Sequence, residues 1–272
     1  AVKTPALSYQ VSRNLLVVTT RSADTAAVAG PVTLLRGSRR RELRPSYTDQ
    51  SQSTYLYDLR AGRPDSIRFG RLSQRFTREA LMPAGREFSF ATAHLGLGFG
   101  PKTLFDTLYL QTSYQQGLWT VHLPQTPLYE NLALTLRPDT RPADLRRSAI
   151  YSITAKGGKG YVGGKWSPDS TSITAPIRAF GQFRILTDTT PPSGRLLSKS
   201  AAGVAFKVGD DLSGLASYRL EVNGQFRLLR FENITATLFT ERTDTLGPAL
   251  RGPATLRLTD QAGNEKIISV VL

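Results

Sequence analysis

The amino-acid sequence predicts an all-β protein built from tandem immunoglobulin-like β-sandwich modules. Apolar and polar residues alternate with a period near two, and short runs are separated by Gly, Pro, Asn and Asp. Helix signals are poor: the best candidate, Asp144–Ser148 after Pro142, spans barely one turn. These three observations favour sheets throughout the chain.

The predicted strands end at residues that interrupt a sheet ladder. The run 118–123 ends at Pro124, and the run 132–136 ends before Pro138. The run 152–155 leads into a Lys-Gly-Gly turn. Proline lacks the N–H group that a ladder uses, and glycine supplies turn conformations. Further strands are predicted, in chain order, at 55–59, 104–110, 173–177, 183–186, 204–208, 254–258 and 267–272.

Two breaks in composition divide the chain into three predicted modules. Residues 187–192 combine a polar run with a double proline, which favours an extended, stiff linker. Residues 82–85 separate a first part rich in Tyr and Arg from a Gly-rich second part. The predicted β-sandwich modules are therefore 1–83, 84–188 and 189–272, each of a size usual for immunoglobulin-like domains.

The composition excludes several kinds of site. The chain has no cysteine, only two histidines and a formal net charge of +14, from 35 basic and 21 acidic residues. Disulfides, thiolate zinc sites and thiol nucleophiles are therefore ruled out. The glycine-rich run 95–100 is followed by Pro101 and another predicted strand, so it lacks the helix that a phosphate-binding loop needs. We expect no enzyme activity and no cofactor.

The sequence contains neither a recognisable membrane-spanning segment nor a recognisable export signal. No apolar run approaches the roughly 20 residues that span a bilayer, so no transmembrane segment is expected. The N-terminus lacks a basic stretch followed by an apolar core, so no signal peptide remains. Either a targeting segment has been removed or the chain is part of something longer.

The last module carries two loop motifs of the forms D-D-x-S-G, at 210–214, and D-x-x-G-N, at 260–264. Such motifs recur in bacterial immunoglobulin-like domains. One interpretation is that Asp210 and Asp211 ligate calcium, which prefers hard carboxylate oxygens. The other is turn chemistry alone, in which Asp and Asn side chains bind nearby backbone amides. The second is favoured, because two adjacent aspartates supply too few of the six to eight oxygens that calcium takes.

The excess positive charge is concentrated in two groups of arginines. Guanidinium groups suit phosphates and carboxylates, and a positive field speeds the encounter with polyanions. No RNA-recognition, helix-turn-helix or zinc-finger pattern accompanies the charge, so nucleic acid is a disfavoured partner. A solvated basic surface is the plainest interpretation, and an acidic envelope polymer or acidic protein is the next. The candidate partner-binding residues are Arg36, Arg39, Arg40, Arg41 and Arg44 in one group and Arg137, Arg141, Arg146 and Arg147 in the other.

A series of short segments resembles a known family. They are 55–67, 104–110, 126–132, 179–192 and the two aspartate motifs of the last module. In this order they resemble the non-catalytic β-rich C-terminal region of exported lysostaphin-type zinc metallopeptidases of Bacteroidetes. The resemblance implies an immunoglobulin-like accessory region without the peptidase domain. The family's H-x-x-x-D and H-x-H zinc pairs are absent here, so no catalytic residue is carried over.

Three hypotheses about function follow. The first is a non-enzymatic array of β-sandwich modules, periplasmic, outer-membrane-associated or extracellular, that positions or docks an envelope protein or an acidic cell-wall polymer. The second is a fragment or subunit of a peptidoglycan-cleaving zinc metallopeptidase. The third is a polyanion-binding protein that acts through its arginine groups. The oligomeric state is left open.

Overall fold

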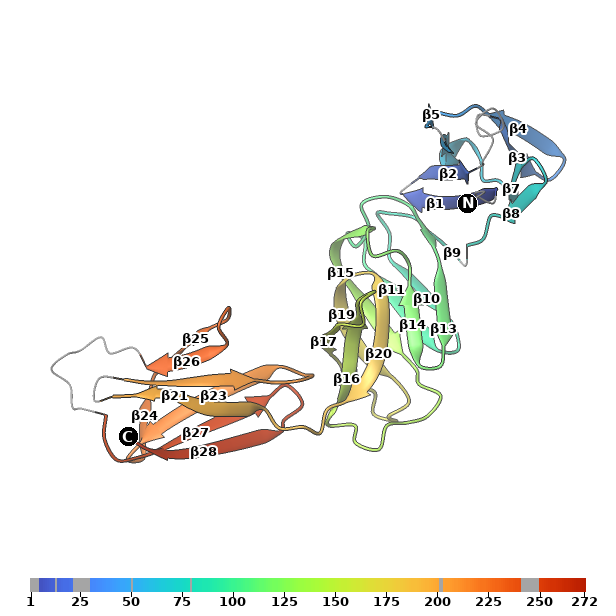
Figure 1. Cartoon of the computed structure of the whole chain (residues 1–272). Helices are drawn as coiled ribbons and strands as arrows, with labels where there is room; N and C mark the ends of the chain where they lie inside the picture. The colour runs from blue at the N-terminus through green and yellow to red at the C-terminus, as the bar shows by residue number, and fades with distance from the viewer. Residues whose placement is uncertain are drawn as a thin grey trace. The chain divides into compact units, whose positions relative to one another are not determined.

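The computed structural model describes residues 5–12, 14–21, 30–49, 51–78, 80–200, 203–240 and 250–272 (Figure 1). These residues form 28 strands and a single 3₁₀ turn, η1 (Leu59–Ala61). The prediction of an all-β fold is confirmed. Within the described ranges, no helix has the length and apolar character needed to cross a membrane.

Two compact units divide the chain. One comprises Ala1–Gln115, Trp119–Leu134 and Pro176–Gly181, and the other comprises Gln116–Leu118, Thr135–Ala175 and Gln182–Leu272. The boundaries predicted from composition, after residues 83 and 188, stay predictions.

The N-terminal strands form a β-sandwich of two four-stranded sheets. One sheet has the order β1-β2-β6-β5 and the other the order β4-β3-β7-β8. Alternate residues of both sheets, such as Leu16 of β2 and Leu34 of β3, enter one buried apolar cluster, as the period of two requires. The strands are β1 (Ala6–Ser12), β2 (Leu15–Arg21), β3 (Val32–Arg36), β4 (Arg39–Leu43), β5 (Tyr47–Thr48), β6 (Gln52–Asp58), β7 (Ser66–Phe69) and β8 (Leu72–Arg75).

The next part of the chain forms two five-stranded sheets and a short pair. The orders are β10-β11-β15-β19-β18, β13-β14-β20-β16-β17 and β12-β9 (Figure 1). The bounds of the first sheet and the pair are β9 (Ala80–Met82), β10 (Phe88–Ala91), β11 (Leu95–Phe99), β12 (Leu108–Leu110), β15 (Pro127–Leu136), β18 (Lys165–Trp166) and β19 (Ile173–Ala179). Those of the second sheet are β13 (Thr112–Gln115), β14 (Leu118–Val121), β16 (Ser148–Ile153), β17 (Lys159–Gly163) and β20 (Gly181–Thr187).

The C-terminal strands form another β-sandwich. Its sheets have the orders β21-β22-β26-β25 and β24-β23-β27-β28, and their inner faces share one core that includes Phe206 and Leu256. The strands are β21 (Ser193–Lys199), β22 (Val204–Gly209), β23 (Leu215–Val222), β24 (Gln225–Arg227), β25 (Leu229–Glu232), β26 (Thr237–Thr240), β27 (Pro253–Asp260) and β28 (Glu265–Val271). Asn223 and Gly224 join β23 to β24 with positive φ angles of 51° and 72°, as a type I′ hairpin requires.

One predicted strand differs from the structure, and the weak helix candidate forms no helix. The predicted strand 104–110 is reduced to β12, and Leu104 forms only an isolated bridge with Leu128. The segment 144–148 forms bends held by the Asp144 side chain, which accepts from the backbone N–H groups of Arg146 and Arg147. An aspartate that binds nearby amides competes with a helix in this way.

His122 follows β14 and is 5% exposed, and its ring meets the ring of Phe180 edge-on with centroids 5.3 Å apart. Burial lowers the pKa of His122 to about 4. The unfolded chain, with a histidine pKa of about 6.5, takes up a proton first as the pH falls. The structure around His122 therefore keeps its full stability above about pH 6.5 and loses part of it between about pH 6.5 and 4.

An NMR titration of the imidazole signals tests the lowered pKa of His122. The chain has only two histidines, so His122→Gln identifies the His122 signal by its loss. We expect a titration midpoint at about pH 4. A midpoint at or above about 6.5, the value of a solvated histidine, would contradict the burial of this ring.

Candidate functional site

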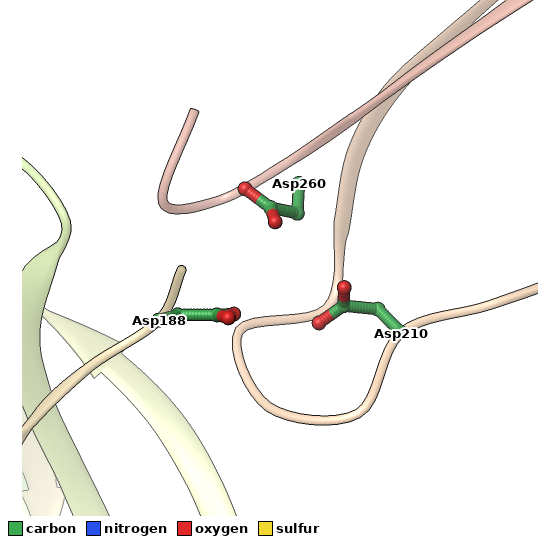
Figure 2. A group of neighbouring side chains, drawn as sticks. All are labelled: Asp188, Asp210 and Asp260. Carbon is green, nitrogen blue, oxygen red and sulfur yellow. The ribbon is translucent and has the colours of Figure 1, made fainter. Parts of the chain in front are cut away.

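Three aspartates from distant parts of the chain converge at one point (Figure 2). Asp188 follows β20, Asp210 follows β22, and Asp260 is the last residue of β27. One oxygen from each carboxylate lies within 4.8 Å of the others, and Figure 2 shows the three side chains directed toward one another. We call these residues the aspartate cluster.

Turn chemistry places two of the carboxylates. Asp210 Oδ2 accepts hydrogen bonds from the backbone N–H groups of Leu212 and Gly214, over 3.1 and 2.7 Å. Asp260 Oδ1 accepts one from the backbone N–H of Asn264, over 2.8 Å. The predicted loop chemistry of both motifs is therefore present, and each loop folds around its own first aspartate.

Asp188 connects the two loops. Its Oδ2 accepts from the backbone N–H of Ser213 over 2.9 Å. Its backbone carbonyl accepts from Asn264 Nδ2 over 2.9 Å, and the same amide group also donates to Asp260 Oδ2 over 2.9 Å. One buried asparagine thus connects Asp188 to the end of β27.

The electrostatics of the aspartate cluster are unfavourable without a counter-charge. Asp188 and Asp260 are each 2% exposed, and Asp210 is partly buried. Two unit charges 4.8 Å apart repel by roughly 3 kcal/mol at an effective dielectric constant of about 20. No lysine or arginine of the described chain forms an ion pair with any of the three. The backbone and side-chain amides are the donors that the described residues supply.

Three polar oxygens at this place have no hydrogen-bond partner within the described structure: Asp210 Oδ1, Ser213 Oγ and the Tyr151 hydroxyl. Tyr151 is fully buried in β16. Burial raises the pKa of Tyr151, and the nearby carboxylates of Asp188, Asp210 and Asp260 raise that pKa further. Buried polar groups are nearly always paired, so these oxygens mark a position for a ligand or bound water.

Of the two calcium candidates, Asp210 and Asp211, only Asp210 lies in the aspartate cluster. Asp211 is exposed and does not join the cluster, because Asp210 turns inward to bind the loop amides while its neighbour faces solvent. Asp188 and Asp260 take its place. Asp260 belongs to the motif that sequence reasoning treated as a turn, and Asp188 is the last residue of the predicted second module.

A second candidate site lies in the N-terminal sandwich. Four residues of the first arginine group line one groove together with Arg63 and Tyr57: Arg36, Arg39, Arg40 and Arg41. We call this the arginine groove. Its arginines flank the turn between β3 and β4, where Arg36 pairs with Arg39 across the hairpin. The fifth member, Arg44, is exposed just after β4 and does not line the groove.

Tyr57 gives the arginine groove a fixed wall. The Arg41 guanidinium carbon lies 5.0 Å from the centre of the Tyr57 ring, within the range of a cation–π contact. The Tyr57 hydroxyl donates to the carbonyl of Gly62 over 2.7 Å. Gly62 has a φ of 127°, which favours glycine, and a Cβ here would lie 2.5 Å from Arg36 Nη1.

A neighbouring groove extends the basic surface. Arg63 and Pro64 line both grooves, and the second is also lined by Arg75, Arg78 and the acidic Asp65. Burial lowers the pKa of Arg78, and the positive charge of Arg63 lowers it further. These two guanidinium groups therefore repel each other, and a bound anion would reduce this repulsion. Sequence reasoning missed Arg63, Arg75 and Arg78, because they are scattered along the chain.

The second arginine group lines neither of these two grooves. Arg141 and Arg146 are exposed in the segment between β15 and β16, which also contains Arg137 and Arg147. Arg147 forms an ion pair with Asp144 over 3.3 Å.

The comparisons with known proteins concern one segment and a few distant structures. Residues 79–188 match the family model described as a Zu5-like domain. No curated protein matches the chain. Apo expansin of Clavibacter michiganensis is 14% identical, over 45% of this chain and 66% of the expansin, with a TM-score of 0.27.

Two further structures have lower scores. TarS 217–571 of S. aureus is 7% identical, over 100% of this chain and 62% of that chain, with a TM-score of 0.19. A marsupial T cell receptor is 11% identical, over 97% of this chain and 99% of that chain, with a TM-score of 0.20. The chain thus spans less than two thirds of the expansin and TarS chains. TM-scores this low carry no argument about function.

Replacing the bridging asparagine tests the network around Asp188. Asn264→Ala leaves the Asp188 carbonyl and Asp260 Oδ2 without their amide donor in a buried position. We expect a loss of about 2 kcal/mol in the stability of the C-terminal sandwich. Calorimetry in EDTA should show its transition lowered by roughly 10 °C.

Asn233→Ala is the matched control, because Asn233 is exposed in the turn between β25 and β26 of the same sandwich. We expect its transition to stay close to that of the unaltered protein. Equal melting of the two variants would show that the buried amide has no special role.

Proposed function

We propose that this chain is a non-enzymatic array of β-sandwich modules of an exported bacterial protein, which docks onto an acidic polymer of the cell surface. Its place would be the periplasm, the outer membrane or the cell exterior. The resemblance to the accessory region of lysostaphin-type metallopeptidases motivates this setting. In such a protein the array would position a catalytic domain against its substrate.

The observation that carries the docking proposal is the arginine groove. Five arginines from β3, β4 and the segment after η1 line it around one tyrosine ring. Guanidinium forks bind carboxylates and phosphates with two parallel hydrogen bonds. Tyr57 is only 8% exposed, and its contact with Arg41 holds that guanidinium group in place before a ligand arrives.

Charge supports an extended anionic ligand rather than a single small anion. The two adjoining grooves share Arg63, so basic groups continue from Arg39 and Arg40 at one side to Arg75 and Arg78 at the other. The formal charge of +14 adds a long-range attraction for polyanions. An acidic polysaccharide meets both grooves with repeated carboxylates.

Binding of polygalacturonate, a linear polymer of carboxylated sugars, tests the proposal. The variant Arg39→Gln/Arg40→Gln removes two exposed guanidinium groups of the groove and leaves the Arg41–Tyr57 contact. We expect about tenfold weaker binding by titration calorimetry, because charge-assisted hydrogen bonds are lost. Affinity of the unaltered protein should fall steeply with salt.

The control is Arg141→Gln/Arg146→Gln, which removes the same charge from the exposed segment between β15 and β16. We expect it to bind nearly as well as the unaltered protein. Equal losses in both variants would mean that only net charge matters. If the groove binds duplex DNA more tightly than polygalacturonate, the proposed ligand is a nucleic acid and not an acidic polysaccharide.

A further inference from the structure

The ligand atoms of the aspartate cluster suit a hard cation. Asp188, Asp210 and Asp260 offer carboxylate oxygens from three separate segments, all within 4.8 Å of one another. Two oxygens bound to one calcium ion lie at most about 5.2 Å apart, twice the longest usual bond, so these separations allow all three carboxylates to bind one calcium ion. No histidine or cysteine belongs to this group, which disfavours zinc.

An independent observation also indicates a ligand at this position. Ser213 is 3% exposed and its hydroxyl has no partner, while its backbone N–H binds Asp188 Oδ2, which places the residue inside the cluster. Asp210 Oδ1 is a buried acceptor without a donor. A cation would be bound by this free carboxylate oxygen and by the hydroxyl oxygen.

The Tyr151 hydroxyl approaches the same place from β16. It is buried and without a partner, and its ring meets Tyr161 edge-on with centroids 5.5 Å apart. The Tyr161 hydroxyl donates to the carbonyl of Gln261, the residue after Asp260, over 3.4 Å. The strands β16 and β17 therefore each bring one tyrosine near the cluster.

We propose that Asp188, Asp210 and Asp260 bind one calcium ion, which fixes the segment after β20 to the two loops of the C-terminal sandwich. The ion compensates three neighbouring negative charges that have no basic side chain beside them in the described structure. Six amide hydrogen bonds hold the carboxylates in position before the ion arrives. This site goes beyond the docking function and does not depend on it.

Calorimetric titration of the EDTA-treated, desalted protein with calcium chloride tests the site. We expect one ion per chain, with a dissociation constant on the order of 10⁻⁴ M, in the range of extracellular modules. Asp210→Asn keeps an oxygen for the loop amides and puts an amide group in place of the free Oδ1. We expect calcium affinity to fall about tenfold or more in this variant.

Asp211→Asn is the matched control, since it removes the same charge from the adjacent, exposed residue. It should bind calcium like the unaltered protein. Melting temperature gives a second readout: calcium should raise it similarly in the unaltered protein and in Asp211→Asn and clearly less in Asp210→Asn, while all three fold in EDTA.

Three results would overturn the proposal. The first is the absence of both heat and thermal stabilisation with calcium at 10 mM, about 100 times the expected dissociation constant. The second is equal calcium binding by Asp210→Asn and Asp211→Asn. The third is binding of magnesium but not calcium at the same residues, which would assign the site to the smaller ion.

Discussion

Asp188 makes a different contact with each of its polar groups, although the sequence that follows it is polar and rich in proline. Its N–H donates to the Arg147 carbonyl, its carboxylate accepts from Thr190 and Ser213, and its carbonyl accepts from Asn264. A segment of this composition is ordinarily exposed to solvent. Burial of this one residue determines where the chain leaves β20 and how it meets the loops at 210–214 and 260–264.

The same contacts concentrate negative charge within a strongly basic protein. Carboxylates at 188, 210 and 260 gather in a buried position, while the arginines of the N-terminal sandwich line open grooves at the surface. The two arrangements serve different ends. In the proposed account, buried carboxylates without a basic side chain beside them bind a small cation, whereas exposed guanidinium groups bind an extended anion.

Sequence reasoning reached the fold because local patterns decide it. The period of two predicts the alternate burial of residues in β15 and β19. The Asn-Gly pair at 223–224 likewise has the residue types that suit the hairpin between β23 and β24. The loop motifs also behave as their residue types require, since each begins with an aspartate that binds its own amides. These features involve neighbours along the chain.

The candidate sites depend on contacts between distant residues, and the sequence therefore reveals only parts of them. Asp188 binds residues 25 and 76 positions away, which no local pattern indicates. The sequence does not distinguish Asp211 from Asp210 as a ligand, because only the folded loop determines which of the two side chains points toward the cluster. Arg63 and Arg78 join the basic surface through the pairing of sheets, whereas the adjacent arginines 39–41 could be recognised as a group.

The central claim is that a cation lies between the three carboxylates, and anomalous diffraction tests it most directly. Crystals of the full chain grown with manganese, an anomalous scatterer that takes oxygen ligands, would show the ion itself. The account predicts one anomalous peak bonded to oxygens of Asp188, Asp210 and Asp260, and its loss in Asp210→Asn crystals. An ordered structure without a peak at these residues, or with the same peak in Asp210→Asn, would contradict it.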